Sequence, residues 1–175
     1  LMRPYRFDEG RLIVREMTEA LVLDLVDKRL KTDQMTLTVG YDRENLEGPA
    51  GEKRCQGEEA TDRYGRRVPR HAHGTANLKG MTSSTQIIAE AVLELYDRIV
   101  DSGLTLRRVT VTANHLTDET EAKGEEKCEQ LDLFTDYEAV EREREAEAVR
   151  LSKERRLQEA MLTVKKKYGG NALLK

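Results

Sequence analysis

The segment between Ser83 and Gly103 constrains the fold most, because it has the pattern of an amphipathic helix with both ends marked. Its start, Ser83-Ser-Thr-Gln86, matches a capping box, and Gly103 stands where a glycine commonly ends a helix. Apolar residues recur at helical spacing at Ile87, Ile88, Ala91, Val92, Leu95, Tyr96, Ile99 and Val100. We therefore expect one buried face, which needs a second layer of structure to cover it.

Strands that supply this layer are indicated by alternation of apolar and polar residues. Met35, Leu37 and Val39 face one way in the segment 34–41, whereas Thr36 and Thr38 face the other. The segments 71–78 and 106–116 alternate in the same manner. A further helix is predicted from about Asp8 to Leu30, so the order is helix, strand, strand, helix, strand.

That order lacks one strand of a β-α-β-β-α-β unit. The predicted fold class is α+β, with a four-stranded antiparallel sheet covered on one face by two helices. The missing strand belongs before Asp8, and the absence of an initial Met suggests an excised fragment that begins just after that strand or within it. Leu1 to Tyr5 would be its remnant.

Composition indicates one modest domain with extensions. The 175 residues are 38% hydrophobic and 36% charged and include no Trp, so the core is small. We predict a domain over 1–118 with a long loop or insertion at 42–70, a linker at 119–136, and a charged tail at 137–175. Within the tail, the Glu- and Arg-rich stretch 137–167 is typical of a mostly solvated helix.

Several classes of protein are disfavoured by the same sequence. There is no 18-residue apolar run, so no membrane span is expected. Cys55 and Cys128 are far apart in polar stretches, which fits a reducing cytoplasm better than a disulfide framework. His71-x-His73 alone is a weak metal pattern, and we expect no metal site. No nucleophile-base order and no phosphate-binding glycine loop mark an active site.

The outward residues of the three strands form a polar face that suits a DNA backbone. Hydroxyls, amides and edge arginines donate hydrogen bonds to phosphate oxygens without reading sequence, and the lack of aromatic residues argues against base stacking. Net charge is only −3, so such contacts must be local. The predicted DNA-binding residues are Arg66, Arg67, Arg70, His73, Thr75, Lys79, Ser83, Ser84, Arg107, Arg108, Thr110 and Thr112. The competing interpretations are that Thr is a common surface residue of strands and that Ser83 and Ser84 only cap a helix.

Residues Gln130-Leu131-Asp132-Leu133-Phe134 resemble the peptide by which bacterial DNA-handling proteins dock on the ring-shaped sliding clamp. In such an anchor the Gln amide makes hydrogen bonds at a pocket rim, while the Leu and Phe side chains fill an apolar cleft. The competing interpretation is an ordinary apolar run at the start of a core helix.

Five further stretches together resemble the C-terminal part of UmuC/DinB-type Y-family DNA polymerases. They are Gln34 to Asp42, Arg70 to Leu78, Thr82 to Thr85, Arg107 to Thr112, and Lys167 to Leu174. The resemblance implies a little-finger domain that grips template and primer backbones, with Arg107 and Arg108 near the template strand. It also implies that the intact protein copies damaged template with two magnesium ions held by an N-terminal palm.

The resemblance implies that this fragment, which lacks the palm carboxylates, polymerises nothing and holds no cofactor. The alternative is a protein-interaction module that uses the sheet face or the charged helix without touching DNA, with self-association through that helix. Lesion preference, fidelity and the roles of 42–70 and of the charged helix do not follow from the sequence.

Overall fold

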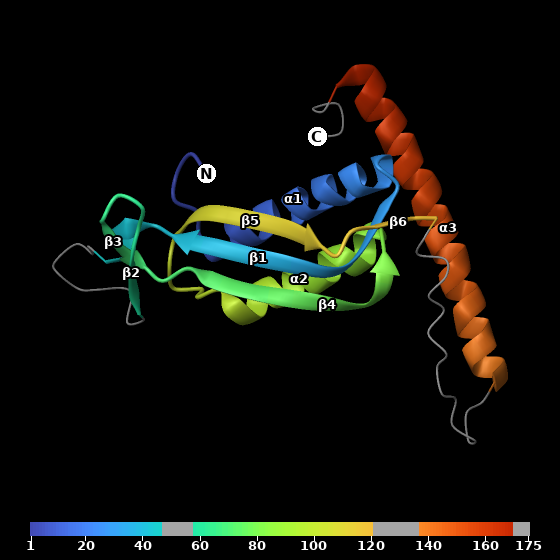
Figure 1. The fold of residues 1–175 in the computed structure, drawn as a ribbon, viewed down its shortest axis with the longest axis horizontal. Coiled ribbons are helices and arrows are strands. Elements are labelled where there is room, and N and C mark those ends of the chain that lie inside the picture. Colours follow the sequence, from blue (N-terminus) through green and yellow to red (C-terminus); the bar gives the residue numbers. More distant parts are fainter. Residues whose placement is uncertain (47–57, 121–136, 170–175) are drawn as a thin grey trace.

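A computed structural model describes residues 1–46, 58–120 and 137–169, except for the side chains of 137–140. Its helices and strands follow the predicted order, with a hairpin added (Figure 1). They are α1 (Phe7–Asp27), β1 (Leu30–Tyr41), the 3-10 helix η1 (Arg43–Asn45), β2 (Glu59–Thr61), β3 (Arg67–Pro69), β4 (Ala72–Thr82), α2 (Thr85–Ile99), β5 (Leu106–Asn114), β6 (Thr117–Asp118) and α3 (Tyr137–Tyr168).

The main sheet is antiparallel, and its strand order is β4-β1-β5, with β6 paired to the start of β1. Each apolar row crosses all three long strands, so that Leu37 lies between Gly74 and Val111. The predicted α+β class with a four-stranded antiparallel sheet is confirmed. The fourth strand among the described residues is the short β6.

The expected N-terminal strand is reduced to one bridge. Tyr5 and Leu106 exchange two backbone hydrogen bonds, of 2.9 and 2.7 Å, on the side of β5 that faces away from β1. Among Leu1 to Tyr5, the described structure thus pairs one residue with β5, and a single residue pair is not a strand.

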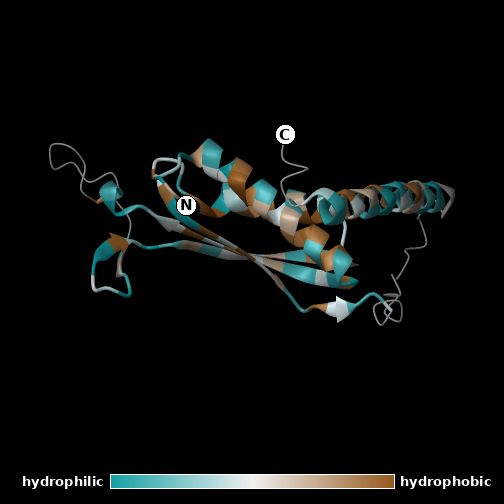
Figure 2. Ribbon diagram, turned by 90° about the horizontal axis from the view of Figure 1, so that it is seen from above, coloured by the Kyte–Doolittle hydropathy of each residue, from teal (hydrophilic) through white to brown (hydrophobic). Residues whose placement is uncertain are grey.

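Both α1 and α2 cover one face of the sheet and leave the other face open (Figure 2). The core lies between these layers, and its largest fully buried side chains include Tyr96, Met35 and Leu37. Gly10 lets α1 approach closely, because a Cβ at this position would collide with the side chain of Leu106. Apolar residues of both helices, among them Val14, Val22, Ile88 and Val92, belong to this core, as amphipathic spacing requires.

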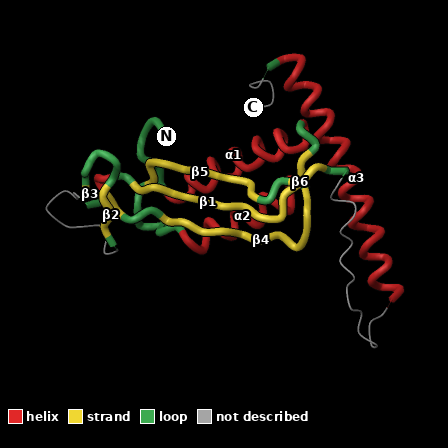
Figure 3. The backbone as a smooth tube through the Cα atoms, in the orientation of Figure 1, coloured by secondary structure: helices red, strands yellow, loops and turns green. Residues whose placement is uncertain are grey.

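The excursion after Asp42 contains η1 and a two-stranded hairpin, β2–β3, in its described part. The predicted turn at Tyr64-Gly65 is confirmed, and Gly65 has a φ of +77°, a conformation that glycine adopts without strain. The hairpin lies at one end of the sheet and α3 lies at the other (Figure 3).

Candidate nucleic-acid interface

The open face of the sheet carries the polar residues that alternation assigned to it. Rows of three cross the strands in the order β4, β1, β5: Asn77-Gln34-Asn114, Thr75-Thr36-Thr112 and His73-Thr38-Thr110. In each row, a hydroxyl or amide of β1 lies between polar side chains of β4 and β5, so that the whole face presents hydrogen-bond donors and acceptors.

Hydrogen bonds link neighbours along these rows. The amide of Gln34 donates to Asn77 Oδ1 at 2.9 Å and accepts from Asn114 Nδ2 at 3.1 Å. Thr38 Oγ1 lies 2.9 Å from His73 Nδ1. These contacts fix side-chain rotamers and leave lone pairs and donors over for a partner.

Arg107 and Arg108 meet at one end of this face because of a β-bulge. Gly40 pairs with Arg108, whereas the next residue of β1, Tyr41, pairs with Leu106, so Arg107 is the extra residue of β5. A bulge re-aims side chains, and here both exposed arginines line one hollow with Thr110. Gly40 makes room for this arrangement, since a Cβ there would lie 3.3 Å from Arg108 Cβ.

The two arginines differ in how they are engaged. Arg107 donates to the carbonyl oxygen of Met2 at 3.3 Å, and its Nε lies 3.7 Å from Asp42 Oδ2. Arg108 has no ion-pair partner in the part of the chain that the structure describes. Of the two guanidinium groups, that of Arg108 is therefore the better placed to donate hydrogen bonds to a phosphate.

The other three arginines predicted to bind DNA form ion pairs within the β2–β3 hairpin and its ends. Arg66 pairs with Asp62 at 2.7 Å, Arg67 with Glu59, and Arg70 with Glu58. Arg66 lines the hollow, whereas Arg67 and Arg70 do not. Exposed pairs of this kind contribute only about 0–1 kcal/mol, so a phosphate can replace the carboxylate at small cost.

The remaining predicted residues fall in two places. Lys79 is exposed on β4 and follows the same alternation as His73 and Thr75. Ser83 and Ser84 are nearly buried and lie instead beneath α3, at the start of α2. The predicted capping box is wrong, because Ser84 rather than Ser83 is the N-cap and Ile87 is therefore the third helical residue. Ser84 Oγ accepts from Ile87 N at 3.3 Å, so only the simple serine cap is formed.

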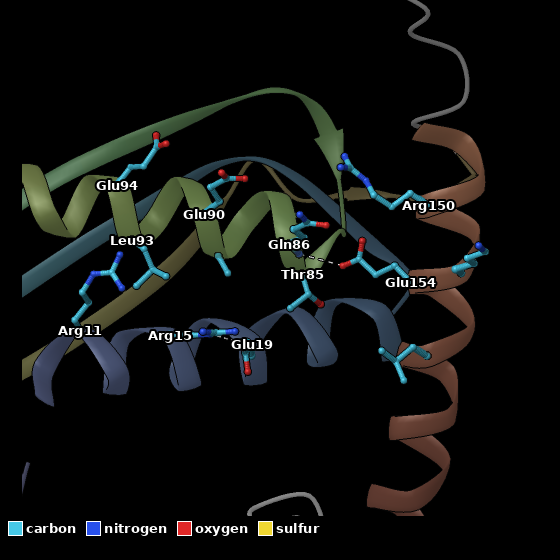
Figure 4. Close-up of a pocket in the computed structure, with 13 residues that line it drawn as sticks. Arg11, Arg15, Glu19, Thr85, Gln86, Glu90, Leu93, Glu94, Arg150 and Glu154 are labelled. Atoms are coloured by element: carbon cyan, nitrogen blue, oxygen red, sulfur yellow. Dashed lines mark hydrogen bonds and ion pairs between the residues drawn. The ribbon is translucent and has the colours of Figure 1, made fainter. Parts of the chain in front are cut away.

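A carboxylate from α3 takes the place next to this N-cap. Glu154 accepts from Ser84 Oγ at 2.7 Å and from the backbone N–H of Gln86 at 3.0 Å (Figure 4). Negative charge is favourable at a helix N-terminus, where backbone N–H groups are unsatisfied. Near the C-terminal end of α3, Lys165 pairs with Asp24 of α1 at 3.2 Å. The charged helix is thus docked at both α1 and α2.

Gln158 is the buried part of this docking. It is 4% exposed, and its amide donates to Ser83 O and Thr85 Oγ1, both at 2.9 Å. We expect Gln158→Ala to lower the free energy of unfolding by about 1–3 kcal/mol, because Ser83 O loses its donor. Chemical denaturation measures this, and Gln86→Ala at an exposed position is the matched control. Equal losses in the two variants would contradict the expectation.

A second hollow lies between α1, α2 and α3 (Figure 4). It is lined by four basic and four acidic side chains, so its charge does not favour a polyanion. The residues are Arg11, Arg15, Arg150 and Lys153, with Glu19, Glu90, Glu94 and Glu154.

Two features are absent from the ranges that the structure describes. No group of three or more His, Cys, Asp or Glu in these ranges is arranged to hold a metal ion. Among the helices described, none combines the length and apolar character that a membrane crossing demands. The peptide Gln130 to Phe134 lies outside the described residues.

The described residues thus form a two-layer α+β domain whose open sheet face is polar and has Arg107 and Arg108 at one end. A family model described as the impB/mucB/samB family C-terminal domain matches residues 2–133, well over half of the chain. The chain belongs to this family and carries the C-terminal, little-finger domain of a UmuC/DinB-type Y-family DNA polymerase. No curated protein matches the sequence. The helix α3 lies beyond the matched residues.

Proposed function

We propose that this domain grips the sugar-phosphate backbone of primer-template DNA through the open face of its sheet. The observation that carries the proposal is the bulge that brings Arg107 and Arg108 to one end of a face made mostly of hydroxyls and amides. Backbone contacts of this kind position a duplex without reading its sequence, as a polymerase that moves along DNA requires. We assign catalysis and cofactor binding to none of these residues.

The DNA contact is tested by replacing Arg107 and Arg108 together with alanine. Each phosphate contact contributes about 0.9 to the slope of log affinity against log salt. We therefore expect weaker binding to every duplex sequence and a slope reduced by about two. Fluorescence anisotropy with a labelled primer-template, repeated over several salt concentrations, measures both quantities.

The matched control removes the same charge from the helix side. Arg15 and Arg98 lie on α1 and α2, and the double change Arg15→Ala plus Arg98→Ala should leave the salt slope as it is. If the variant that lacks Arg107 and Arg108 binds like the parent at all salt concentrations, the sheet face is not the DNA contact.

We further propose that Gln130 to Phe134 docks the polymerase on the bacterial sliding clamp in the cytoplasm. A second attachment raises the local concentration of the domain at the primer terminus, so that a weak, sequence-independent grip suffices. The support is the residue pattern itself, which lies next to the DNA-gripping domain in the chain.

A protein-interaction module remains the second candidate, and the exposed outer part of α3 favours it. Residues 141–150 are exposed throughout, and Glu alternates with Arg from Glu141 to Glu145, which is a self-complementary charge pattern. Analytical ultracentrifugation tests it: a dimer that dissociates when Arg142 and Arg144 are reversed to Glu would support self-association, and a monomer at all concentrations would contradict it.

A further inference from the structure

We propose that the hollow between the β2–β3 hairpin and the sheet is a stacking site for one unpaired base of a DNA strand, with Tyr64 as the stacking side chain. The inference rests on the proposed DNA grip and adds a subsite to it. Base stacking was not expected from the strands, because their outward residues are not aromatic.

Tyr64 has the exposed position that a side chain needs in order to stack on a base. It lies at the tip of the hairpin, it is 79% exposed, and it lines the same hollow as Arg108 and Thr110. The only other exposed tyrosine among the large apolar side chains of the described ranges, Tyr168, is on α3. The fold buries little of this ring, whereas a base stacked on it would remove apolar surface of both partners from water.

The turn that carries Tyr64 is fixed by a single carboxylate. Asp62 accepts from the backbone N–H of Tyr64 at 2.8 Å, from the backbone N–H of Arg66 at 2.9 Å, and from Arg66 Nε at 2.8 Å. The bond from Arg66 holds the pKa of Asp62 below its usual range, so these contacts persist at neutral pH. A ring on a preorganised turn loses little entropy when a ligand stacks on it.

Arg66 also prepares the ring for a partner. Its guanidinium carbon lies 5.0 Å from the centroid of the Tyr64 ring, and Asp62 keeps it there. A cation on one face of the ring leaves the opposite face for a base. With Arg66 on one face, the Tyr64 ring thus has one face left for a stacking partner.

Charge around the hollow indicates a polyanion as the ligand. Five arginines and three carboxylates line it, which leaves a net charge of +2 with His71 neutral. The basic side chains are Arg43, Arg63, Arg66, Arg107 and Arg108, and the acidic ones are Asp42, Glu44 and Asp62. An aromatic ring beside positive charge fits a nucleotide, whose base stacks while its phosphate reaches Arg108.

The test uses the full chain and two DNA probes. One is a primer-template with a short single-stranded overhang that carries 2-aminopurine at successive positions, and the other is a blunt duplex of the same sequence. We expect the parent to quench 2-aminopurine at one overhang position. Tyr64→Ala should abolish the quenching and weaken overhang binding about tenfold, and should leave blunt-duplex binding unchanged. Tyr64→Phe should behave like the parent.

Tyr168→Ala is the matched control, because Tyr168 is also exposed and has a cation, Lys167, 5.3 Å from its ring centroid. It should change neither probe. If Tyr64→Ala keeps both quenching and overhang affinity while the loss of Arg107 and Arg108 weakens the blunt duplex, the stacking site is wrong and the DNA grip stands. If the parent binds neither probe, both proposals fall.

Discussion

Replacing Tyr96 with alanine is expected to lower the free energy of unfolding by about 3–5 kcal/mol, the loss typical of a large aromatic side chain removed from a core. Tyr96 is fully buried between the helices and the sheet, and its ring centroid lies 4.9 Å from that of Phe7. Its hydroxyl donates to Phe7 O at 2.8 Å, which fixes the start of α1. Urea denaturation followed by circular dichroism measures the change.

Two variants separate the causes of this loss. Tyr96→Phe keeps the ring and removes only the hydrogen bond, so it should cost about 1 kcal/mol. Tyr64→Ala removes an exposed ring and should stay within about 0.5 kcal/mol of the parent. If Tyr96→Ala is no less stable than Tyr64→Ala, the packing of α1 and α2 on the sheet is not as described.

The Tyr96 hydroxyl also predicts a pH dependence for the same experiment. Burial raises the pKa of Tyr96 above its ordinary value, so the folded state favours the neutral phenol. The stability that this shift contributes is complete below the pKa of an unfolded tyrosine, about 10, and is lost as pH rises beyond it. Tyr96→Phe should therefore lose less stability than the parent above about pH 10.

The second large effect concerns the sliding clamp. Replacing Leu133 and Phe134 together with alanine should weaken clamp binding at least a hundredfold, because such anchors supply about 2 kcal/mol or more each. Isothermal titration of purified bacterial clamp with the chain measures the affinity. Val149→Ala plus Leu157→Ala, which removes two exposed apolar side chains of α3, is the control. A double variant that binds as tightly as the parent would refute clamp docking.

Alternation along the strands was sufficient to predict the sheet and its polar face. Thr36, Thr38, Thr75, Thr110 and Thr112 all lie on the open face, because the strand period of two is a local property of the backbone. Helical spacing likewise located α1 and α2 to within a few residues. Alternation also excludes register shifts of one residue, because such a shift would turn the apolar side of a strand away from the core. The order β4-β1-β5 is known only from the structure.

Contacts between distant segments could not be predicted in this way. Nothing in the sequence marks Arg107 as a bulge residue, because the bulge depends on how Gly40 and Tyr41 pair with β5. The interaction of Ser84 with Glu154 joins residues 70 positions apart, and only the docking of α3 creates it. Capping alone was the simpler prediction for this serine, and the structure adds the carboxylate beside it.

The place of Tyr64 in a hollow beside the sheet could not be predicted, for a different reason. The segment 42–70 has no periodicity, so the sequence predicted its turn but not the hairpin at the end of the sheet. The sequence Asp62-Arg-Tyr64-Gly65 did carry a signal for the turn at the tip of the hairpin. An Asp side chain often begins a turn by accepting a hydrogen bond from the backbone N–H two residues later, as Asp62 does from Tyr64.

The docking of α3 determines where mechanical load would enter the domain. Residues 121–136 connect β6 to α3 in the sequence, and β6 is paired with the central strand β1. An ion pair of 3.1 Å between Glu119, just after β6, and Arg155 of α3 joins the segments on either side of this connection. If the sliding clamp binds Gln130 to Phe134, as proposed above, a force on the clamp would act on the sheet and on α3 at the same time. Tension would thus be shared between two anchorages, and a single proteolytic cut between 121 and 136 would leave α3 held only by its side-chain contacts.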